Sequence, residues 1–294
     1  MTTINNGMIA TGGSTISNST NHGGSIGMPW PASPASRPPR SADVGVLTIL
    51  DQEIRAVEAV LRQMHDYREQ RLHHGPLARE AWWPATGGRR VRLAAVQTLT
   101  RGTDSAALAY RGLVEAYNPS TVLLVGIAGG VSPRVDIGDV VVSDEVIAYD
   151  ARRVTAEGAH RRGQAQSVAG PLGHRLNDFF ATTPVHQRRP SGDDFHLHRG
   201  PIGSGNAVVT DVDSDIRRWL HAFNEKVLAV ETEAAGVAQS FHESVGRDGP
   251  RGWLTIRGIS DTADRHKDHD HHGIASRHAA EVMAMLAPYL CFDD

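Results

Sequence analysis

The sequence of 294 residues contains a single cysteine, Cys291, which excludes an internal disulfide and a thiolate metal site. One free thiol suits a reducing compartment, so we expect a cytoplasmic protein. No apolar run reaches the roughly eighteen residues that a membrane span needs. The N-terminus also lacks the basic start and continuous apolar core of a secretory signal. These absences predict a protein with no membrane partner.

The chain also lacks an excess of charge of either sign. Thirty Lys and Arg against 33 Asp and Glu leave a formal net charge of -3, with no broad basic field for nucleic acid. At 40% hydrophobic and 21% charged residues, the chain can bury a full core. We therefore expect a small-molecule partner and no nucleic acid.

The composition changes near residue 43. Residues 1–42 are rich in Gly, Ser, Thr and Asn and then in Pro, and few of their side chains could offset the entropy of ordering by burial. We predict a disordered tail over residues 1–42 and one folded domain over residues 43–294. A linker to a partner is the alternative for the tail.

From residue 43 onward, short apolar runs alternate with helical periodicity, which predicts a three-layer α/β domain with a largely parallel or mixed sheet. The expected strands cover 44–50, 91–99, 121–125, 139–149, 196–203, 207–210, 226–230 and 253–259. The expected helices cover 52–67, 104–117, 171–182, a stretch from 214, 232–244 and 274–290. Residues 186–194 are polar and predict a loop.

Chemically active or small residues follow several of these strands. The carboxyl ends of strands line the ligand crevice of an open α/β sheet, so these residues could meet in one pocket. For each one alone, a helix cap, a first-turn acid or a loop ion pair is the competing interpretation. The residues are Asp51, Glu53, Arg101, Gly126 to Gly130, Glu231, Glu233 and Asp261.

The glycine-rich stretch at residues 126–130 does not predict a triphosphate cradle. It lacks the Lys-Ser/Thr ending of a P-loop, and no helix is predicted directly after it. Small residues such as Ala128 and Gly129 instead allow the backbone to approach a flat ligand closely. We expect this turn to form one wall of the pocket.

Five motifs in order carry a family resemblance: VLLVGIAGGV (122–131), GDVVVSDEVIAYD (138–150), GPIGSGNAVV (200–209), AVETEAAGVAQ (229–239) and TIRGISDTAD (255–264). Together they resemble the purine nucleoside phosphorylase and nucleosidase superfamily over residues 44–290. The pattern is most similar to 5'-methylthioadenosine/S-adenosylhomocysteine nucleosidases. The resemblance implies a three-layer phosphorylase/hydrolase-like fold, with a central mixed sheet flanked by helices.

The resemblance also implies roles in cleaving the N-glycosidic bond of an adenine nucleoside. Asp261 would donate a proton to purine N7, which improves a poor leaving group. Glu233 would bind the ribose hydroxyls and stabilise the positive charge that develops on the sugar. Glu53 stands where the nucleosidases hold the glutamate that activates water, and Arg257 would orient it. Thr232 replaces a methionine of the nucleosidase pattern.

Further positions are expected to bind the substrate, and two of them depart from the nucleosidase pattern. Val208 stands where a phenylalanine usually stacks on adenine, and Arg101 stands where an apolar residue lies near the 5' substituent. A guanidinium favours phosphate over a methylthio group, so a 5'-phosphorylated purine nucleotide is a second candidate substrate. An exposed loop arginine is the competing interpretation. Ala128, Gly129, Val209 and Ser260 complete the expected binding residues.

Water and phosphate are the two possible acceptors of the ribosyl group. Phosphorylases of the hexameric bacterial type carry an arginine and a serine near the glycine-rich turn, where this chain has Leu124 and Ile127. Apolar side chains cannot hold a phosphate dianion, so we favour hydrolysis. A phosphorylase with a displaced phosphate site, releasing ribose 1-phosphate, is one alternative. A purine-binding sensor module without turnover is another.

Histidines 266, 269, 271 and 272 alternate with aspartates near the end of the last motif. No helical i, i+4 zinc motif is present, and the reaction implied by the resemblance needs no metal. We predict a surface loop beside the pocket that could act as a lid, and we expect no metal and no cofactor. We expect a homodimer.

Overall fold

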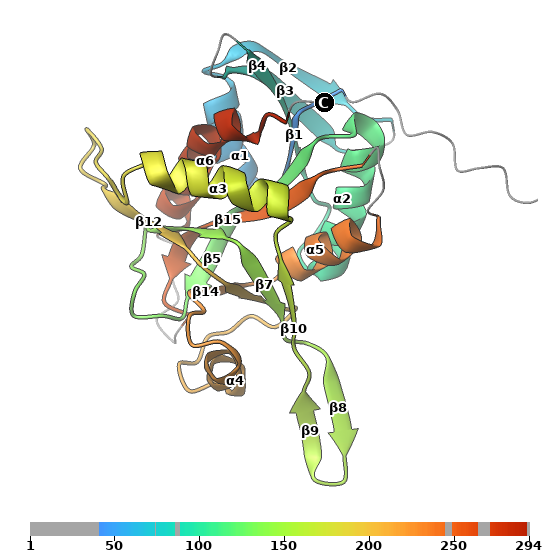
Figure 1. Ribbon diagram of the computed structural model, residues 1–294, viewed down its shortest axis with the longest axis vertical. Coiled ribbons are helices and arrows are strands. Elements are labelled where there is room, and N and C mark those ends of the chain that lie inside the picture. The colour runs from blue at the N-terminus through green and yellow to red at the C-terminus, as the bar shows by residue number, and fades with distance from the viewer. Residues whose placement is uncertain (1–40, 74, 86–88, 245–248, 264–270, 293–294) are drawn as a thin grey trace, which may run out of the picture. The chain divides into compact units, whose positions relative to one another are not determined.

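A computed structural model describes residues 41–73, 75–85, 89–244, 249–263 and 271–292 (Figure 1). The tail predicted over residues 1–42 lies outside the described residues except for its last two. The backbone amides of Ser41 and Ala42 donate to the Tyr117 carbonyl at 2.9 and 3.3 Å. The polypeptide is therefore already hydrogen-bonded to the domain at residue 41.

The centre of the domain is a parallel set of buried strands. In this set β1 pairs with β4 and β5, and β5 pairs with β15. Their side chains are buried on both faces of the sheet, which explains the nearly continuous apolar runs in the sequence. The strands are β4 (Arg90–Gln97), β1 (Val44–Thr48), β5 (Thr121–Gly130) and β15 (Gly252–Asp261).

Antiparallel partners make the sheet mixed. Strand β14 pairs antiparallel with the end of β5, β6 with β15, and β3 with both β4 and β2, so that thirteen strands of the described chain share one sheet. The remaining members are β2 (His65–Arg71), β3 (Leu77–Pro84), β6 (Val140–Ser143), β7 (Glu145–Ala148), β10 (Gln164–Ser167), β11 (His186–Gln187), β12 (Phe195–Arg199), β13 (Ile202–Ser204) and β14 (Ala229–Glu231).

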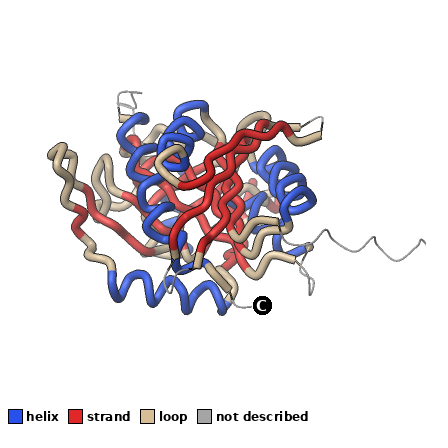
Figure 2. Tube along the Cα trace, turned by 90° about the horizontal axis from the view of Figure 1, so that it is seen from above, coloured by secondary structure: helices blue, strands red, loops and turns tan. Residues whose placement is uncertain are grey.

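Helices cover both faces of the sheet, as Figure 2 shows by the helices on either side of the strands. Helices α1, α3 and α6 contribute to one buried cluster, and α2 and α5 contribute to the other. No helix among the described residues is both long and apolar enough to cross a membrane. The helices are α1 (Asp51–Leu61), α2 (Thr103–Tyr117), α3 (Gly170–Thr182), α4 (Asp215–Phe223), α5 (Ala234–Glu243) and α6 (His272–Leu286), followed by a 3₁₀ turn at Ala287–Leu290.

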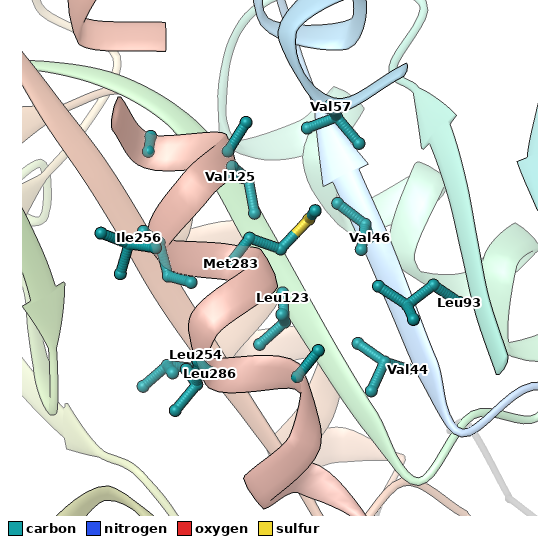
Figure 3. Packing of buried hydrophobic residues seen from close by; sticks show 14 of the residues in the cluster. Val44, Val46, Val57, Leu93, Leu123, Val125, Leu254, Ile256, Met283 and Leu286 are labelled. Atoms are coloured by element: carbon teal, nitrogen blue, oxygen red, sulfur yellow. The ribbon is translucent and has the colours of Figure 1, made fainter. Parts of the chain in front are cut away.

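Side chains along the central strands point alternately to the two faces of the sheet, so that neighbouring residues belong to two different cores. On β5, Leu123 and Val125 point toward α6, whereas Leu124 belongs to the core beneath α2 and α5. Figure 3 shows Met283 and Leu286 of α6 packed over the side chains of β1, β5 and β15. The predicted three-layer α/β fold with a mixed central sheet is confirmed.

Several element predictions are wrong in detail. The helix predicted over 52–67 ends at Leu61, because His65–Arg71 leaves the helix to pair with β3 as an exposed polar strand. Residues 139–149 form β6 and β7, and residues 196–203 form β12 and β13, so each predicted strand is two. The strand predicted at 207–210 is irregular backbone. Its apolar residue Val209 is buried at the pocket wall and makes no strand pairs.

Strands without clear apolar periodicity also lie in the segments that were predicted to be polar connections. Strands β3 and β10 join the sheet, and β8 (Arg152–Thr155) pairs with β9 (Gly158–Arg161) as a separate hairpin. Figure 1 shows this hairpin extending away from β7 and β10. The predicted turn at residues 126–130 is instead the second half of β5, which pairs with β15 as far as Gly129.

The contact between β15 and α6 generates a stability prediction. A Cβ added at Gly258 would lie 2.6 Å from the backbone carbonyl carbon of Ala275 in α6. We expect Gly258→Ala to lower the free energy of unfolding in urea by about 1–3 kcal/mol, the usual cost of overpacking.

Gly112→Ala is the matched control, because a Cβ at Gly112 on α2 would meet no atom within 4 Å. There the same substitution should stabilise the protein by roughly 0.5–1 kcal/mol through helix propensity. Equal effects of the two substitutions would show that α6 does not approach β15 this closely.

Candidate functional site

A cavity of about 250 Å³ opens where β1, β5, β14 and β15 end. Every residue expected to act in catalysis or substrate binding lines it except Arg257, whereas Asp51, Gly126 and Gly130 of the wider candidate set do not. The walls comprise Ile49, Leu50, Glu53, Arg101, Ile127, Ala128, Gly129, Ala207, Val208, Val209, Val230, Glu231, Thr232, Glu233, Ser260, Asp261 and His272. The structure therefore brings together residues that lie up to 223 positions apart in the chain, Ile49 and His272 being the extremes.

Arg257 lies behind the cavity and is fully buried. Its Nη2 forms ion pairs with Glu231 and, at 3.2 Å, with Glu233 Oε2. Burial opposes the charged guanidinium, but the charges of Glu231, Glu233 and Glu53 outweigh this effect and raise the pKa of Arg257. The guanidinium is thus the shared counter-charge of three carboxylates. The hydrogen bonds described for it go to Glu231 and Glu233, not to Glu53 as expected from the sequence.

Glu53 is held by backbone amides. Its Oε2 accepts hydrogen bonds from the amides of Ile49 and Leu50 at 2.7 and 2.8 Å, and its Oε1 accepts from Ile127 at 2.9 Å. Burial raises the pKa of Glu53, and Arg257 together with the three amides offsets only part of that rise. The helix-start interpretation is also correct, because Glu53 is the N3 residue of α1 and caps it. One side chain serves both the helix and the cavity.

Glu231 and Glu233 divide their contacts between the helix and the cavity. Glu231 accepts hydrogen bonds from the amides of Glu233 and Ala234 at 3.0–3.1 Å and so anchors the start of α5. Burial raises the pKa of Glu231, although Arg257 lowers it. Glu233 Oε1 accepts from the Gly102 amide at 3.1 Å and from the Thr232 hydroxyl. Glu233 is thereby fixed at the cavity wall beside the loop that carries Arg101.

Asp261 ends β15 just after an irregularity in its pairing with β5. Its Oδ2 accepts a hydrogen bond from Ser260 Oγ at 3.0 Å, and its Oδ1 accepts from the Ala263 amide at 2.8 Å. The opposite residue on β5 is Gly129, where a Cβ would lie 2.9 Å from Asp261 Oδ1. The small residue expected to admit a flat ligand thus also makes room for the carboxyl group.

Sequence reasoning missed His272 as a site residue. Residues 264–270 of the histidine-rich segment lie outside the described residues, and His271 is exposed. His272, however, begins α6, is 7% exposed and lines the cavity, so its assignment to a surface loop is wrong. Gln52 Nε2 hydrogen-bonds its Nδ1 at 2.9 Å. Its place at the start of a predicted C-terminal helix was the available signal.

Residues 43–289 match the family model of the phosphorylase superfamily. The chain belongs to this superfamily. The match covers the domain from the first strand to the 3₁₀ turn, so the resemblance inferred from five motifs is confirmed.

Several solved structures share the fold. A 5'-methylthioadenosine/S-adenosylhomocysteine nucleosidase from Neisseria meningitidis, in complex with methylthio-immucillin-A, is 25% identical with a TM-score of 0.63, covering 83% of this chain and 98% of its own. The corresponding nucleosidase from Streptococcus pneumoniae is 21% identical with a TM-score of 0.66, covering 84% and 99%. Futalosine hydrolase from Helicobacter pylori is 18% identical with a TM-score of 0.61, covering 83% and 97%.

The buried ion cluster generates a second stability prediction. Glu231→Gln keeps the shape of the side chain but removes one counter-charge of Arg257. We expect the free energy of unfolding at pH 7 to fall by about 3–5 kcal/mol, the scale for breaking a buried pair on one side. Asp66→Asn is the control, because its 2.7 Å pair with Arg90 is exposed and contributes about 1 kcal/mol or less. A loss as small as that of the control would mean that Glu231 is uncharged.

Proposed function

We propose that this protein is a purine nucleosidase that hydrolyses the N-glycosidic bond of an adenine nucleoside or of its 5'-phosphorylated form. The observation that carries the proposal is the placement of Asp261, Glu233 and Glu53 around one cavity. Glu53 accepts from Ile127 on β5, and Asp261 lies against Gly129 on the same strand. Two residues along a strand span about 7 Å, which separates an acid from a base across a glycosidic bond.

In the proposed reaction the purine lies against Ala128, Gly129 and Val209, with N7 toward Asp261. Asp261 donates its proton to N7 as the bond between N9 and C1' breaks, and the bonding electrons leave with the base. Glu233 accepts hydrogen bonds from the ribose 2' and 3' hydroxyls and stabilises the oxocarbenium-like transition state. A water molecule attacks C1' and gives its proton to Glu53. The products are free adenine and a sugar with a hydroxyl at C1'.

The contacts of Glu53 support water as the nucleophile. Two amides donate to Oε2 and one donates to Oε1, so Oε1 keeps a second lone pair with which it can accept from water. Leu124 is fully buried and Ile127 donates its amide to Glu53, so neither offers a phosphate a cationic partner. A carboxylate at the same place also repels a phosphate dianion. The similar solved structures are named as nucleosidases and a hydrolase, which also favours water as the acceptor of the ribosyl group.

The remaining expectations belong to the same proposal. The proposed chemistry is supplied by side chains alone and uses no cofactor. A homodimer is supported by two exposed apolar side chains, Leu99 at 99% and Leu108 on α2 at 69% exposure. The half-buried free thiol of Cys291 suits a cytoplasmic location. The tail before Ser41 is proposed to take no part in the catalytic domain.

Product analysis tests the proposal. Purified protein is incubated with adenosine, methylthioadenosine, adenosylhomocysteine and AMP, with and without inorganic phosphate, and the sugar product is identified by NMR. Phosphate-independent release of adenine with a free C1' hydroxyl supports a nucleosidase. Ribose 1-phosphate formed only with phosphate would identify a phosphorylase. Purine binding without turnover of any substrate would identify a sensor module.

Removal of the acid is the first kinetic prediction. We expect Asp261→Asn to lower kcat by roughly 10²-fold or more, because amide nitrogen cannot protonate N7 as the bond breaks. Circular dichroism checks that the fold is retained. Turnover close to that of the wild type would exclude Asp261 from the mechanism.

The acid limb of the pH profile is the second kinetic prediction. Glu53 must be a carboxylate to accept a proton from water, and burial raises its pKa above 4.5. Activity is therefore present above the raised pKa and is lost as the pH falls through it. We expect the limb of kcat/KM for adenosine to lie above pH 4.5.

Glu53→Gln tests the assignment of that limb. This variant should lose hydrolysis while it still binds purine, as measured by calorimetry. A variant that keeps both turnover and the limb would show that Glu53 only caps α1.

A further inference from the structure

We infer that Arg217 on α4 is a positioning residue that fixes the carboxyl group of Asp261 at the wall of the cavity. The role of Asp261 as the acid rests on the proposed function. The inference follows from one peptide group, the one that joins Thr262 to Ala263. Arg217 donates to the carbonyl oxygen of this group, and the N–H of the same group donates to Asp261.

The two ends of this peptide group cannot move independently. A peptide group is planar, and in a trans peptide the C=O and the N–H point in opposite directions. No peptide bond among the described residues is cis. Arg217 Nη1 donates to the Thr262 carbonyl at 3.0 Å, and the Ala263 amide donates to Asp261 Oδ1 at 2.8 Å. The guanidinium therefore sets the direction of the hydrogen bond that holds the carboxyl group.

The other donors of Arg217 join the same segment to the neighbouring strand. Its Nη1 also donates to the Ala263 carbonyl at 3.2 Å, and its Nη2 donates to the carbonyl of Val131, directly after β5, at 3.1 Å. Among the described residues, all acceptors of this side chain are backbone carbonyls. A planar guanidinium can span several carbonyls at fixed angles. Arg217 thus joins the ends of β15 and β5, on which Asp261 and Gly129 lie against each other.

The backbone at Ala263 is in a conformation that needs support. Its φ is +50°, in the left-handed region that residues with a Cβ rarely adopt. Ala263 is also fully buried. A disfavoured conformation persists only where the surrounding structure imposes it. Arg217 binds the carbonyls of Thr262 and Ala263, which lie on both sides of the disfavoured residue, and so supplies part of this support.

Helix α4 presents Arg217 from a fixed position. Ser214 caps the helix, because its Oγ accepts from the backbone amide of Arg217 at 3.3 Å. Ile216 and Leu220 are buried in the cluster that also contains Ala263. Figure 1 shows α4 at the end of the domain from which the β8–β9 hairpin extends. The arginine therefore reaches the acid from a helix that has its own contacts with the core.

The same hydrogen bonds stabilise the charge that the proposed reaction produces. Donation of the proton to purine N7 leaves Asp261 as a carboxylate. A cation at the carbonyl end of a peptide group polarises the group and strengthens the hydrogen bond that its N–H donates. Arg217 thereby stabilises the new negative charge through one peptide group, without touching the substrate. We expect its loss to affect bond breaking more than substrate binding.

Steady-state kinetics test this role with whichever of adenosine, methylthioadenosine, adenosylhomocysteine and AMP the wild type cleaves fastest. We expect Arg217→Ala to lower kcat by about 10- to 100-fold, the scale for misplacing a reacting group, and to change KM by less than about twofold. Arg217→Lys should recover only part of the loss, because an ammonium lacks the planar fork. Arg218→Ala is the matched control. Arg218 is the next residue on α4, is exposed and lies outside the cavity wall, so kcat should be unchanged.

A double-mutant cycle separates an effect through Asp261 from general damage to the fold. The acid is already absent in Asp261→Asn. Adding Arg217→Ala to that variant should therefore lower kcat by no more than about a further twofold. A further loss as large as the loss that Arg217→Ala causes in the wild type would overturn the inference, because Arg217 would then act independently of Asp261.

Amide hydrogen exchange distinguishes failure of this inference from failure of the proposed function, because it needs no turnover. We expect the Ala263 amide to exchange about tenfold faster or more in Arg217→Ala, a larger increase than for the amides of β1 and β4. Arg218→Ala should leave the Ala263 amide unchanged. Faster exchange in a protein that cleaves none of the four substrates would keep Arg217 as the residue that fixes Asp261 and reject the nucleosidase. Equal exchange of the Ala263 amide in the wild type and Arg217→Ala would overturn the inference.

Discussion

The site depends on one buried charge, the guanidinium of Arg257. Taking such a group out of water costs several kcal/mol, which only well-placed counter-charges and hydrogen bonds offset. Glu231 and Glu233 meet Arg257 from the start of α5, and Glu53 adds its charge from α1. One guanidinium on β15 thereby constrains the entry points of two helices on opposite faces of the sheet, and these entry points carry the groups that face the cavity.

The same constraint explains the glycines of β5. A Cβ at Gly126 would contact both Arg257 and Glu53, and a Cβ at Gly129 would contact Asp261. The glycine-rich stretch was expected to admit a flat ligand, but Gly126 is required by the ion cluster itself. A strand with small residues at these positions lets charged side chains from β15 and α1 lie against its surface. The small residues of β5 thus allow close contacts within the protein itself, and these contacts need no ligand.

The fold could be predicted largely because its central elements carry strong local signals. Strands β1, β4, β5 and β15 are apolar on both faces, and α2 and α3 have clear helical periodicity with caps or prolines at their ends. Strands β2 and β8 could not be predicted in this way, because they are exposed and polar and depend on pairing partners that sequence periodicity does not contain. At residues 207–210 a strand was predicted because the residues are apolar, but these apolar residues line a cavity and form no strand.

The candidate site was predictable to a similar extent. Glu53, Glu233 and Asp261, expected from their places after predicted strands, line one cavity, because parallel strands end at one edge of a sheet. His272 was missed because its neighbours in the sequence are polar and its burial comes from α1, more than two hundred residues away. Arg257 was expected to orient Glu53; its described hydrogen bonds go to Glu231 and Glu233, whereas Glu53 binds backbone amides, which a sequence does not display. Local chemistry was therefore predictable, and long-range hydrogen bonding was not.

A crystal structure of the Asp261→Asn protein with adenosine bound tests the central claim most directly. The account predicts N7 of the purine beside residue 261, the 2' and 3' hydroxyls on Glu233, and a water molecule between Glu53 and C1'. Arg257 should remain paired with Glu231 and Glu233 behind the ligand. A purine bound at the Glu53 end of the cavity, or outside the cavity altogether, would contradict the account.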